Sequence, residues 1–278
     1  MNKKNRYSVF IFLIAVTVVT IATIGPLFVP KDTNWNHEQL LKLSNNQNEF
    51  SFIVFGDNQD SITTFNRLID KINYENVQFV VDNGDLVAGG EQIEYTLFLE
   101  QIKQSNKPFL TNIGNHDLMR NGSSSNYQKI FGHLYYSFNM GNSYFIMLDS
   151  SSGERLDPQQ IEWLHNQLNK SLKYHNRFVF MHVPLFDPLG RPIEEGHSLR
   201  DVQQAKMLNN LFDHYNITML FCSHIHAYYN GTWGTTPYII TGGAGGPLEH
   251  PDQNHNFYNY VKVNVNQKGV NYQMIRLL

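Results

Sequence analysis

The feature that most constrains this chain is a repeated pattern in which a short apolar run stops at a polar residue able to bind a metal ion. The pattern occurs five times between residues 52 and 226. Continuous apolar runs are typical of buried strands, and in open α/β sheets ligands bind beyond the carboxyl ends of the strands. We therefore predict that the residues ending these runs meet at one edge of the fold. They are Asp57, Asp85, Asn115, His116, His182, His224 and His226.

Helical patterns separate the first three of these runs. Apolar residues recur at helical spacing over 62–72, and a second helix is predicted over 91–103. This alternation of strand and helix indicates a parallel sheet with crossover helices. Further predicted elements are a hairpin around Gly141 and Asn142, a helix from Pro158 that Asp157 caps, a helix over 199–215, and strands over 178–181, 218–221, 238–240, 258–265 and 270–277.

The composition fits one full-sized core and excludes several function classes. The chain has 278 residues, 41% of them hydrophobic, which is enough for one α/β domain. Lys and Arg number 21 against 24 Asp and Glu, and no basic block is long enough to track a nucleic acid, so no nucleic-acid partner is expected. Cys222 is the single cysteine, which excludes an internal disulfide and a cysteine-based zinc site. The sequence has no P-loop and no Gly-x-Ser-x-Gly elbow.

The N-terminal segment is predicted to lie outside the globular fold. Three basic residues precede an uncharged apolar run over 7–29. The run is longer than the apolar core of roughly 7–15 residues in a cleavable signal peptide and fits the roughly 17–25 residues of a spanning helix. We therefore predict a signal anchor with one transmembrane helix within 1–30, the basic flank staying in the cytoplasm.

The rest of the chain divides into a linker and a domain. The polar, Asn-rich stretch 31–49 is predicted to be a linker with a short helix over 37–43, and the domain is predicted over 50–278. The expected location is the cell membrane, with a single span and the domain outside the cytoplasm. If the segment is cleaved instead, the domain is secreted.

The residue types at the predicted edge fit divalent cations. They combine carboxylate, amide oxygen and imidazole without thiolate, which suits hard or borderline ions. Two carboxylates, one amide and three imidazoles exceed the needs of a single open catalytic ion. The set suits two ions about 3.5–4 Å apart that a carboxylate bridges.

The ordered motifs resemble the calcineurin-like metallophosphoesterase superfamily. That family carries Asp-x-His, Gly-Asp, Gly-Asn-His-Asp/Glu, a lone His and Gly-His-x-His in this order, and the resemblance runs from about residue 50 to the C-terminus. The helix stretch 160–164 and the glycine-rich stretch 242–246 also match. The resemblance implies an α/β (α+β) fold in which helices flank a two-sheet β-sandwich.

The same resemblance implies a role for each residue. It implies a dinuclear centre bridged by Asp85, with Asp57 and His226 on the first ion and Asn115, His182 and His224 on the second. His116 binds neither ion and acts as general acid or steadies the phosphoryl transition state. Two divalent ions of manganese, iron or zinc suit these ligands. The predicted function is hydrolysis of a phosphate mono- or diester outside the cytoplasm by a metal-bridging hydroxide.

Two positions depart from the family pattern. The expected Asp-x-His reads Asp57-Asn58-Gln59, and a glutamine is a weaker ligand than an imidazole. Gln59 either binds the first metal through its amide oxygen or hydrogen-bonds a metal-bound water, and in both cases the first ion binds less tightly. The expected Gly-His-x-His has Ser223 in place of glycine and keeps both ligands.

Two further residues are weaker candidates for binding substrate. Arg120 could reach a substrate phosphate, although solvated arginines are commoner. His197 lies in the long loop after His182, although a surface role is favoured. Two alternatives to the enzyme stay open: an inactive metal-binding or sensory domain on the same fold, and a single structural ion. The substrate and the oligomeric state stay open too.

Overall fold

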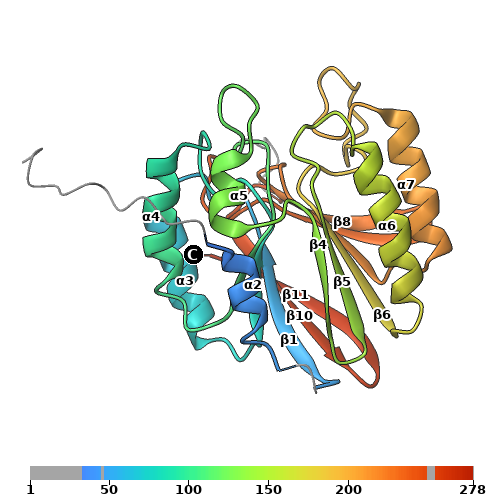
Figure 1. Ribbon diagram of the computed structural model, residues 1–278, viewed down its shortest axis with the longest axis horizontal. Helices are drawn as coiled ribbons and strands as arrows, with labels where there is room; N and C mark the ends of the chain where they lie inside the picture. The colour runs from blue at the N-terminus through green and yellow to red at the C-terminus, as the bar shows by residue number, and fades with distance from the viewer. Residues whose placement is uncertain (1–32, 45–46, 249–253, 278) are drawn as a thin grey trace, which may run out of the picture. The chain divides into compact units, whose positions relative to one another are not determined.

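The predicted apolar runs form the middle of two β-sheets. The computed structural model describes residues 33–44, 47–248 and 254–277 (Figure 1). The first sheet, in the order β11-β10-β1-β2-β3, contains β1 (Phe50–Phe55), β2 (Phe79–Asp82), β3 (Phe109–Thr111), β10 (Asn259–Asn266) and β11 (Gly269–Arg276). The second, in the order β4-β5-β6-β7-β9-β8, contains β4 (Tyr136–Met140), β5 (Ser143–Leu148), β6 (Asn176–Met181), β7 (Met219–Cys222), β8 (Tyr228–Trp233) and β9 (Thr236–Thr241).

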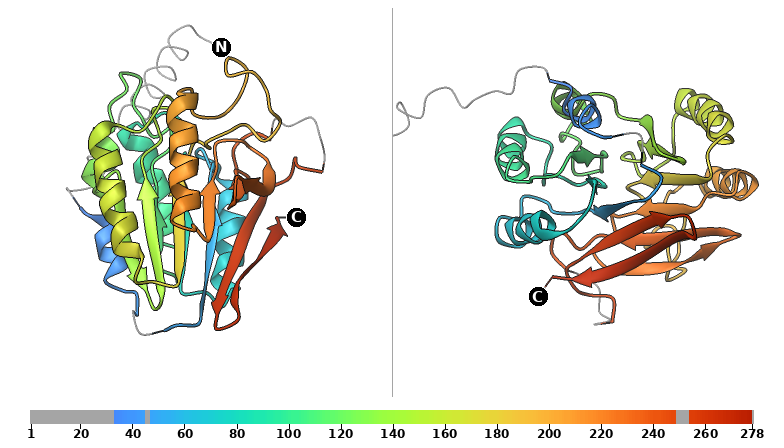
Figure 2. Two further views of the ribbon diagram at one scale, coloured as in Figure 1. Left: turned by 90° about the vertical axis from the view of Figure 1, so that its right-hand side faces the viewer. Right: turned by 90° about the horizontal axis from the view of Figure 1, so that it is seen from below.

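Helices cover the outer face of each sheet, which confirms the predicted α/β sandwich. The helices are α2 (Trp35–Leu40), α3 (Thr63–Tyr74), α4 (Gln92–Ile102), α5 (Ser125–Phe131), α6 (Pro158–Ser171) and α7 (Val202–His214). Helices α3, α4 and α5 lie on the side of the first sheet, and α6 and α7 on the side of the second (Figure 2). Their apolar side chains join the cores beneath them. Asp157 caps α6 as predicted, accepting the N–H groups of Gln159 and Gln160.

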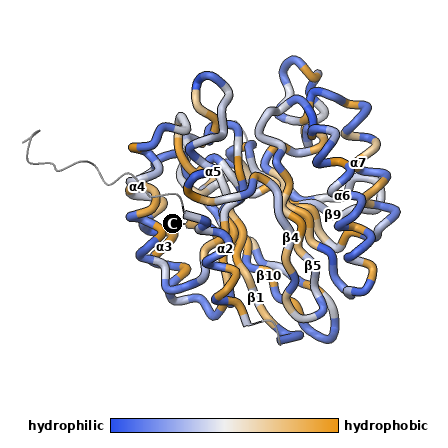
Figure 3. Tube along the Cα trace, in the orientation of Figure 1, coloured by the Kyte–Doolittle hydropathy of each residue, from blue (hydrophilic) through white to orange (hydrophobic). Residues whose placement is uncertain are grey.

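The core between the sheets explains why the strands are apolar on both faces. Alternate residues of β1 point in opposite directions, so Phe52 enters the layer between the sheets while Ile53 faces the helices. Phe52 stacks on Phe79 of its own sheet with ring centroids 5.1 Å apart, and meets Phe178 of the other sheet at 5.3 Å. The hydrophobic stretches therefore follow the strands (Figure 3).

Parallel pairing brings the carboxyl ends of the strands to one edge. β1, β2 and β3 pair in parallel, as do β5, β6, β7 and β9. The predicted hairpin joins β4 and β5, which pair antiparallel around Gly141 and Asn142. Two elements were not predicted. β8 is an edge strand with exposed polar side chains, and α5 is only one to two turns long, so neither carries a strong apolar period.

Part of the range predicted as a linker is built into this fold. Trp35 of α2 donates its indole N–H to the carbonyl of Phe109 (2.7 Å), and the Asn36 side chain exchanges hydrogen bonds with Thr111. β3 is the edge strand of its sheet, so these contacts satisfy backbone groups that no further strand pairs. Residues 35–40 thus differ from a free linker, while the domain division at residue 50 stays a prediction.

The predicted transmembrane segment, 1–30, lies outside the described residues. Among the residues that the structure does describe, no helix combines the length and the apolar character needed to cross a membrane.

Candidate metal centre

All seven residues predicted from the strand ends meet at the carboxyl edge of the two sheets. His182 follows β6 directly, and the others lie in the loops after β1, β2, β3 and β7. Two groups of side chains are each able to hold a metal ion, with ligand atoms within 4.8 Å of one another. One group is Asp85, His182 and His224, and the other is Asp57, Asp85 and His226. Asp85 belongs to both groups, as expected for a bridging ligand.

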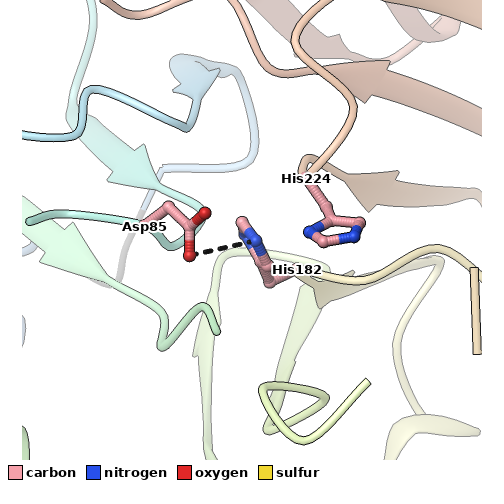
Figure 4. A group of neighbouring side chains, drawn as sticks. All are labelled: Asp85, His182 and His224. Atoms are coloured by element: carbon pink, nitrogen blue, oxygen red, sulfur yellow. Dashed lines mark ion pairs between the residues drawn. The ribbon is translucent and has the colours of Figure 1, made fainter. Parts of the chain in front are cut away.

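Two of the three histidines in these groups are oriented by hydrogen bonds from the ring nitrogen that faces away from the centre. His182 donates Nδ1–H to the carbonyl of Asn83 (3.0 Å), and His226 donates Nδ1–H to the carbonyl of Pro247 (2.6 Å). Each ring therefore presents Nε2 to the centre, as metal-binding histidines commonly do. Nε2 of His182 lies 3.2 Å from Asp85 Oδ1 (Figure 4). It also lies 3.1 Å from Asn115 Oδ1, which adds the amide to this group.

The pKa values of the three histidines reflect their burial and the charged groups packed beside them. Burial disfavours the charged form of His182, but the Asp85 and Asp57 carboxylates outweigh it and raise the pKa of the ring to about 9. Burial likewise opposes charge on His226, while the Asp57 carboxylate beside the ring raises its pKa to about 9. Burial, followed by the charge of His182, lowers the pKa of His224 to about 3.

A buried carboxylate oxygen supports the assignment of these groups to cations. Oδ2 of Asp57 accepts the backbone N–H of His224 (2.8 Å). Oδ1 has no hydrogen-bond partner among the described residues, although the carboxylate is fully buried and Nε2 of His226 lies 3.5 Å away. A buried anionic oxygen needs a positive group beside it, which the protonated rings of His182 (3.8 Å) and His226 supply in the metal-free protein and which a bound cation would supply in their place. The donor set and this oxygen therefore fit divalent cations.

Backbone strain concentrates in the same loops. Asp57, Asp85 and His224 have φ values of 64°, 58° and 70°. A left-handed conformation at a non-glycine residue costs about 1–3 kcal/mol and is typical of functional sites. Gly84 has φ 99°, and a Cβ there would lie 2.7 Å from Nδ1 of His182, so only glycine fits between the loops. The loops hold the ligands at an energetic cost.

Gln59 borders the group of Asp57, Asp85 and His226. Its Nε2 donates to Asp85 Oδ2 (3.1 Å) and lies 3.3 Å from Nε2 of His226. The amide group of Gln59 therefore contacts two members of this candidate ligand group. The two roles predicted for Gln59, as a metal ligand or as a hydrogen-bond partner of a metal-bound water, stay predictions.

His116 lies beside the two groups and belongs to neither. Its Nδ1 donates to the carbonyl of Ala88 (2.9 Å), and Nε2 lies 4.0 Å from Asp85 Oδ2. Its side chain is 43% exposed, in contrast to the buried His182. Its backbone N–H donates to Asp85 Oδ1 (2.8 Å). This placement suits a proton donor facing the cavity.

A cavity of about 470 Å³ opens over the centre. Its lining includes Gln59, Asp85, His116, Leu189, Arg191, His197, His224, Ile225, His226 and Pro247. The loop between β6 and α7 thus contributes His197, for which a surface role was favoured from sequence, and its ring centroid lies 5.5 Å from that of His224. Arg120 is exposed and does not line the cavity, so the structure does not bring it to the site.

Two residues near the site were missed from sequence. Arg191 lines the cavity, and Asp187 holds it by accepting from Nε (2.9 Å) and Nη2 (2.8 Å). Asp117 is buried and accepts the backbone N–H groups of Asp85 (3.0 Å) and Gly114 (2.8 Å), tying two ligand loops together. The sequence signal for Arg191 was its position as a cation in the long loop after β6 and His182. Asp117 stood inside the Gly-Asn-His-Asp motif itself.

The sequence matches one family model. That model, described as calcineurin-like phosphoesterase, matches residues 50–228. The chain is 29% identical over 167 residues to a probable glycerophosphodiester phosphodiesterase GpdQ of Arcobacter nitrofigilis, covering 55% of this chain and 58% of that protein. It is 25% identical over 149 residues to the human serine/threonine-protein phosphatase CPPED1, covering 50% and 48%. The chain thus spans about half the length of these relatives.

Solved structures share the fold. A purple acid phosphatase from yellow lupin seeds superposes with a TM-score of 0.67 at 16% identity, covering 84% of this chain and 52% of that one. GAP50, the anchor in the inner membrane complex of Plasmodium, superposes with a TM-score of 0.62 at 14% identity, covering 83% and 85%. At such identities the likeness concerns the architecture alone.

Proposed function

Because the chain belongs to the calcineurin-like phosphoesterase family, we propose that it is a metal-dependent phosphoesterase with two ions that share Asp85. The observation that carries the proposal is the pair of ligand groups with one carboxylate in common. The proposed ligands are Asp57, Asp85 and His226 for the first ion and Asp85, Asn115, His182 and His224 for the second. Iron, zinc and manganese suit this mixture of carboxylate, amide and imidazole.

The residues of this chain prepare the centre for positive charge and for phosphate. The two ions would supply Lewis-acid catalysis and neutralise charge on the phosphoryl oxygens. To hold the ions, His182 and His226 would give up the protons that their raised pKa values favour, because a ligating imidazole is neutral. His116 keeps Nδ1 on Ala88 and delivers a proton from Nε2 to the leaving-group oxygen. Arg191, on the cavity wall, orients the anionic substrate.

The substrate is proposed as a phosphate mono- or diester. Both classes occur among the similar proteins, which include a probable glycerophosphodiester phosphodiesterase and a phosphatase by name. The proposed location, outside the cytoplasm at the membrane or secreted, rests on the apolar N-terminal sequence over 7–29. N-terminal sequencing of the protein from membrane and culture-medium fractions tests it: a start beyond that run contradicts the anchor.

A second candidate is a metal-binding domain with little or no catalysis. Gln59 favours it, because its amide hydrogen bond occupies Asp85 Oδ2, the carboxylate shared by both groups. Metal analysis combined with hydrolysis assays separates the candidates. Bound metal without turnover of either ester class would support the second one.

The test of the enzyme uses Asp85→Asn in the full-length chain. The protein is stripped with a chelator, reloaded with Mn²⁺ or Zn²⁺, and assayed with p-nitrophenyl phosphate and bis(p-nitrophenyl) phosphate. We expect the variant to lose hydrolysis and metal loading, because both proposed ions lose a ligand. Asp70→Asn, an exposed site on α3, is the matched control and should behave as the parent. Full activity in Asp85→Asn would refute the shared-ligand centre.

A further inference from the structure

The peptide group that holds His116 is itself held by a carboxylate. A carbonyl oxygen only accepts, so the 2.9 Å contact with Ala88 requires that His116 carries its proton on Nδ1. The same peptide group continues to the N–H of Gly89, which donates to Oε2 of Glu94 (3.1 Å). A continuous series therefore runs from the Glu94 carboxylate through the Ala88–Gly89 peptide to the His116 ring.

The turn that contains this peptide is fixed from its other sides. The N–H of Ala88 donates to Oδ2 of Asp60 (3.1 Å), which lies in the loop after β1. Gly90 has φ 68°, and a Cβ there would lie 2.6 Å from the carbonyl oxygen of Asp117. The turn therefore rests against the loop that carries His116 and has little room to shift.

We propose that Glu94 is a positioning residue for His116, acting through the Ala88–Gly89 peptide. A carboxylate bonded to the N–H of a peptide polarises it and strengthens the bond that its carbonyl accepts. The Nδ1–H of His116 then stays on Ala88, and Nε2 alone exchanges a proton with the cavity. In each turnover the proton passes from Nε2 to the leaving oxygen while Nδ1–H is retained. This inference rests on the proposed function of His116.

Helix capping does not account for this contact by itself. Glu94 also accepts the N–H of Glu91 (2.8 Å), and the two residues form a capping box at the start of α4. Capping would be served by that bond alone, whereas the bond to Gly89 reaches outside the helix. Glu91 is thus a matched control, because Glu91→Ala weakens the same cap and leaves the Gly89 contact in place.

The kinetic test compares a poor with a good leaving group. In the metal-loaded full-length chain, Glu94→Ala should lower kcat for phenyl phosphate about 10-fold or more, while p-nitrophenyl phosphate, which needs little protonation, changes less than about twofold. KM and metal content should stay as in the parent. Glu94→Gln keeps an acceptor oxygen and should therefore retain most of the parent's kcat for phenyl phosphate. Glu91→Ala should match the parent on both esters. Equal losses on both esters, or the same loss in Glu91→Ala, would overturn the proposal.

A second measurement, which does not depend on activity, tests the positioning role of Glu94 separately from the proposed function. In ¹⁵N-histidine-labelled protein, with the His116 signals assigned from His116→Asn, the parent should show the Nδ1–H tautomer. Glu94→Ala should move the population towards Nε2–H, and Glu91→Ala should not. An unchanged tautomer in Glu94→Ala refutes the positioning role. If the parent hydrolyses neither ester class, the proposed function fails, while the tautomer measurement still shows whether Glu94 positions His116.

Discussion

The weakest point of the proposed centre is Gln59, and converting it to histidine should tighten the first ion's site. The first group has three protein ligands, Asp57, Asp85 and His226, whereas the second has four once Asn115 is counted. The amide of Gln59 engages Asp85 Oδ2 at 3.1 Å instead of adding a strong donor. Gln59→His releases that oxygen and supplies an imidazole.

The magnitude follows from the change in ligand set. Changing a residue that hydrogen-bonds a metal ligand, as Gln59 does Asp85, typically changes affinity about 10–100-fold, which corresponds to about 1.4–2.8 kcal/mol. We expect the weaker of two binding steps to tighten by this factor and the stronger step to stay unchanged. We assign the stronger step to the second group. Among the described residues, Gln59 has a hydrogen bond to one member of that group, Asp85, which both groups share.

Calorimetric titration of Mn²⁺ or Zn²⁺ into the chelator-treated protein measures both steps. Gln104→His, at an exposed position after α4, controls for the mere addition of a histidine. Gln59→Ala distinguishes the two roles left open for the parent residue: weaker binding indicates a ligand, and unchanged binding indicates a hydrogen-bonding role. If Gln59→His leaves both steps as in the parent, or alters only the stronger one, the placement of the first ion is refuted.

Three further predictions follow from the site. His116→Asn should keep both ions but lower kcat about 10²–10⁴-fold, as for a lost general acid, and metal analysis showing lost ions would instead make His116 a ligand. Arg191→Ala should raise KM more than it lowers kcat in steady-state assays, because Arg191 lines the cavity without belonging to a ligand group; an unchanged KM would remove it from the substrate site. In metal-free protein, His182 and His226 have pKa values raised to about 9 from 6.5. The stability that these two protonated rings contribute is fully present below pH 6.5 and is lost as the pH rises through 9. Urea denaturation should therefore show a free energy of unfolding that falls over this range. Saturating divalent cations should suppress the fall, and a fall that persists in their presence would contradict the assignment of these rings as ligands.

Much of the fold was predictable because its signals are local. The apolar runs, the Gly141-Asn142 turn and the Asp157 cap each depend on residues adjacent in sequence, and all three appear as predicted. β8 escaped prediction because an exposed edge strand needs no apolar period. The docking of α2 onto the fold escaped prediction because it depends on Trp35 and Asn36, which contact β3 some 75 residues away in the chain.

The residue types at the candidate site and their position at the strand ends were predictable from the linear chain. Ligand types, their order and their position after apolar runs are all properties of the linear chain, and parallel pairing carries every such residue to one edge. How these residues divide into two ligand groups became clear only from the tertiary structure. It showed that Asp85 belongs to both groups and that Arg191 lines the cavity while Arg120 does not. It also showed that Glu94 accepts a hydrogen bond from the peptide group that holds His116. These distinctions depend on contacts of a few ångströms between loops far apart in sequence, and no local pattern of residues encodes such distances.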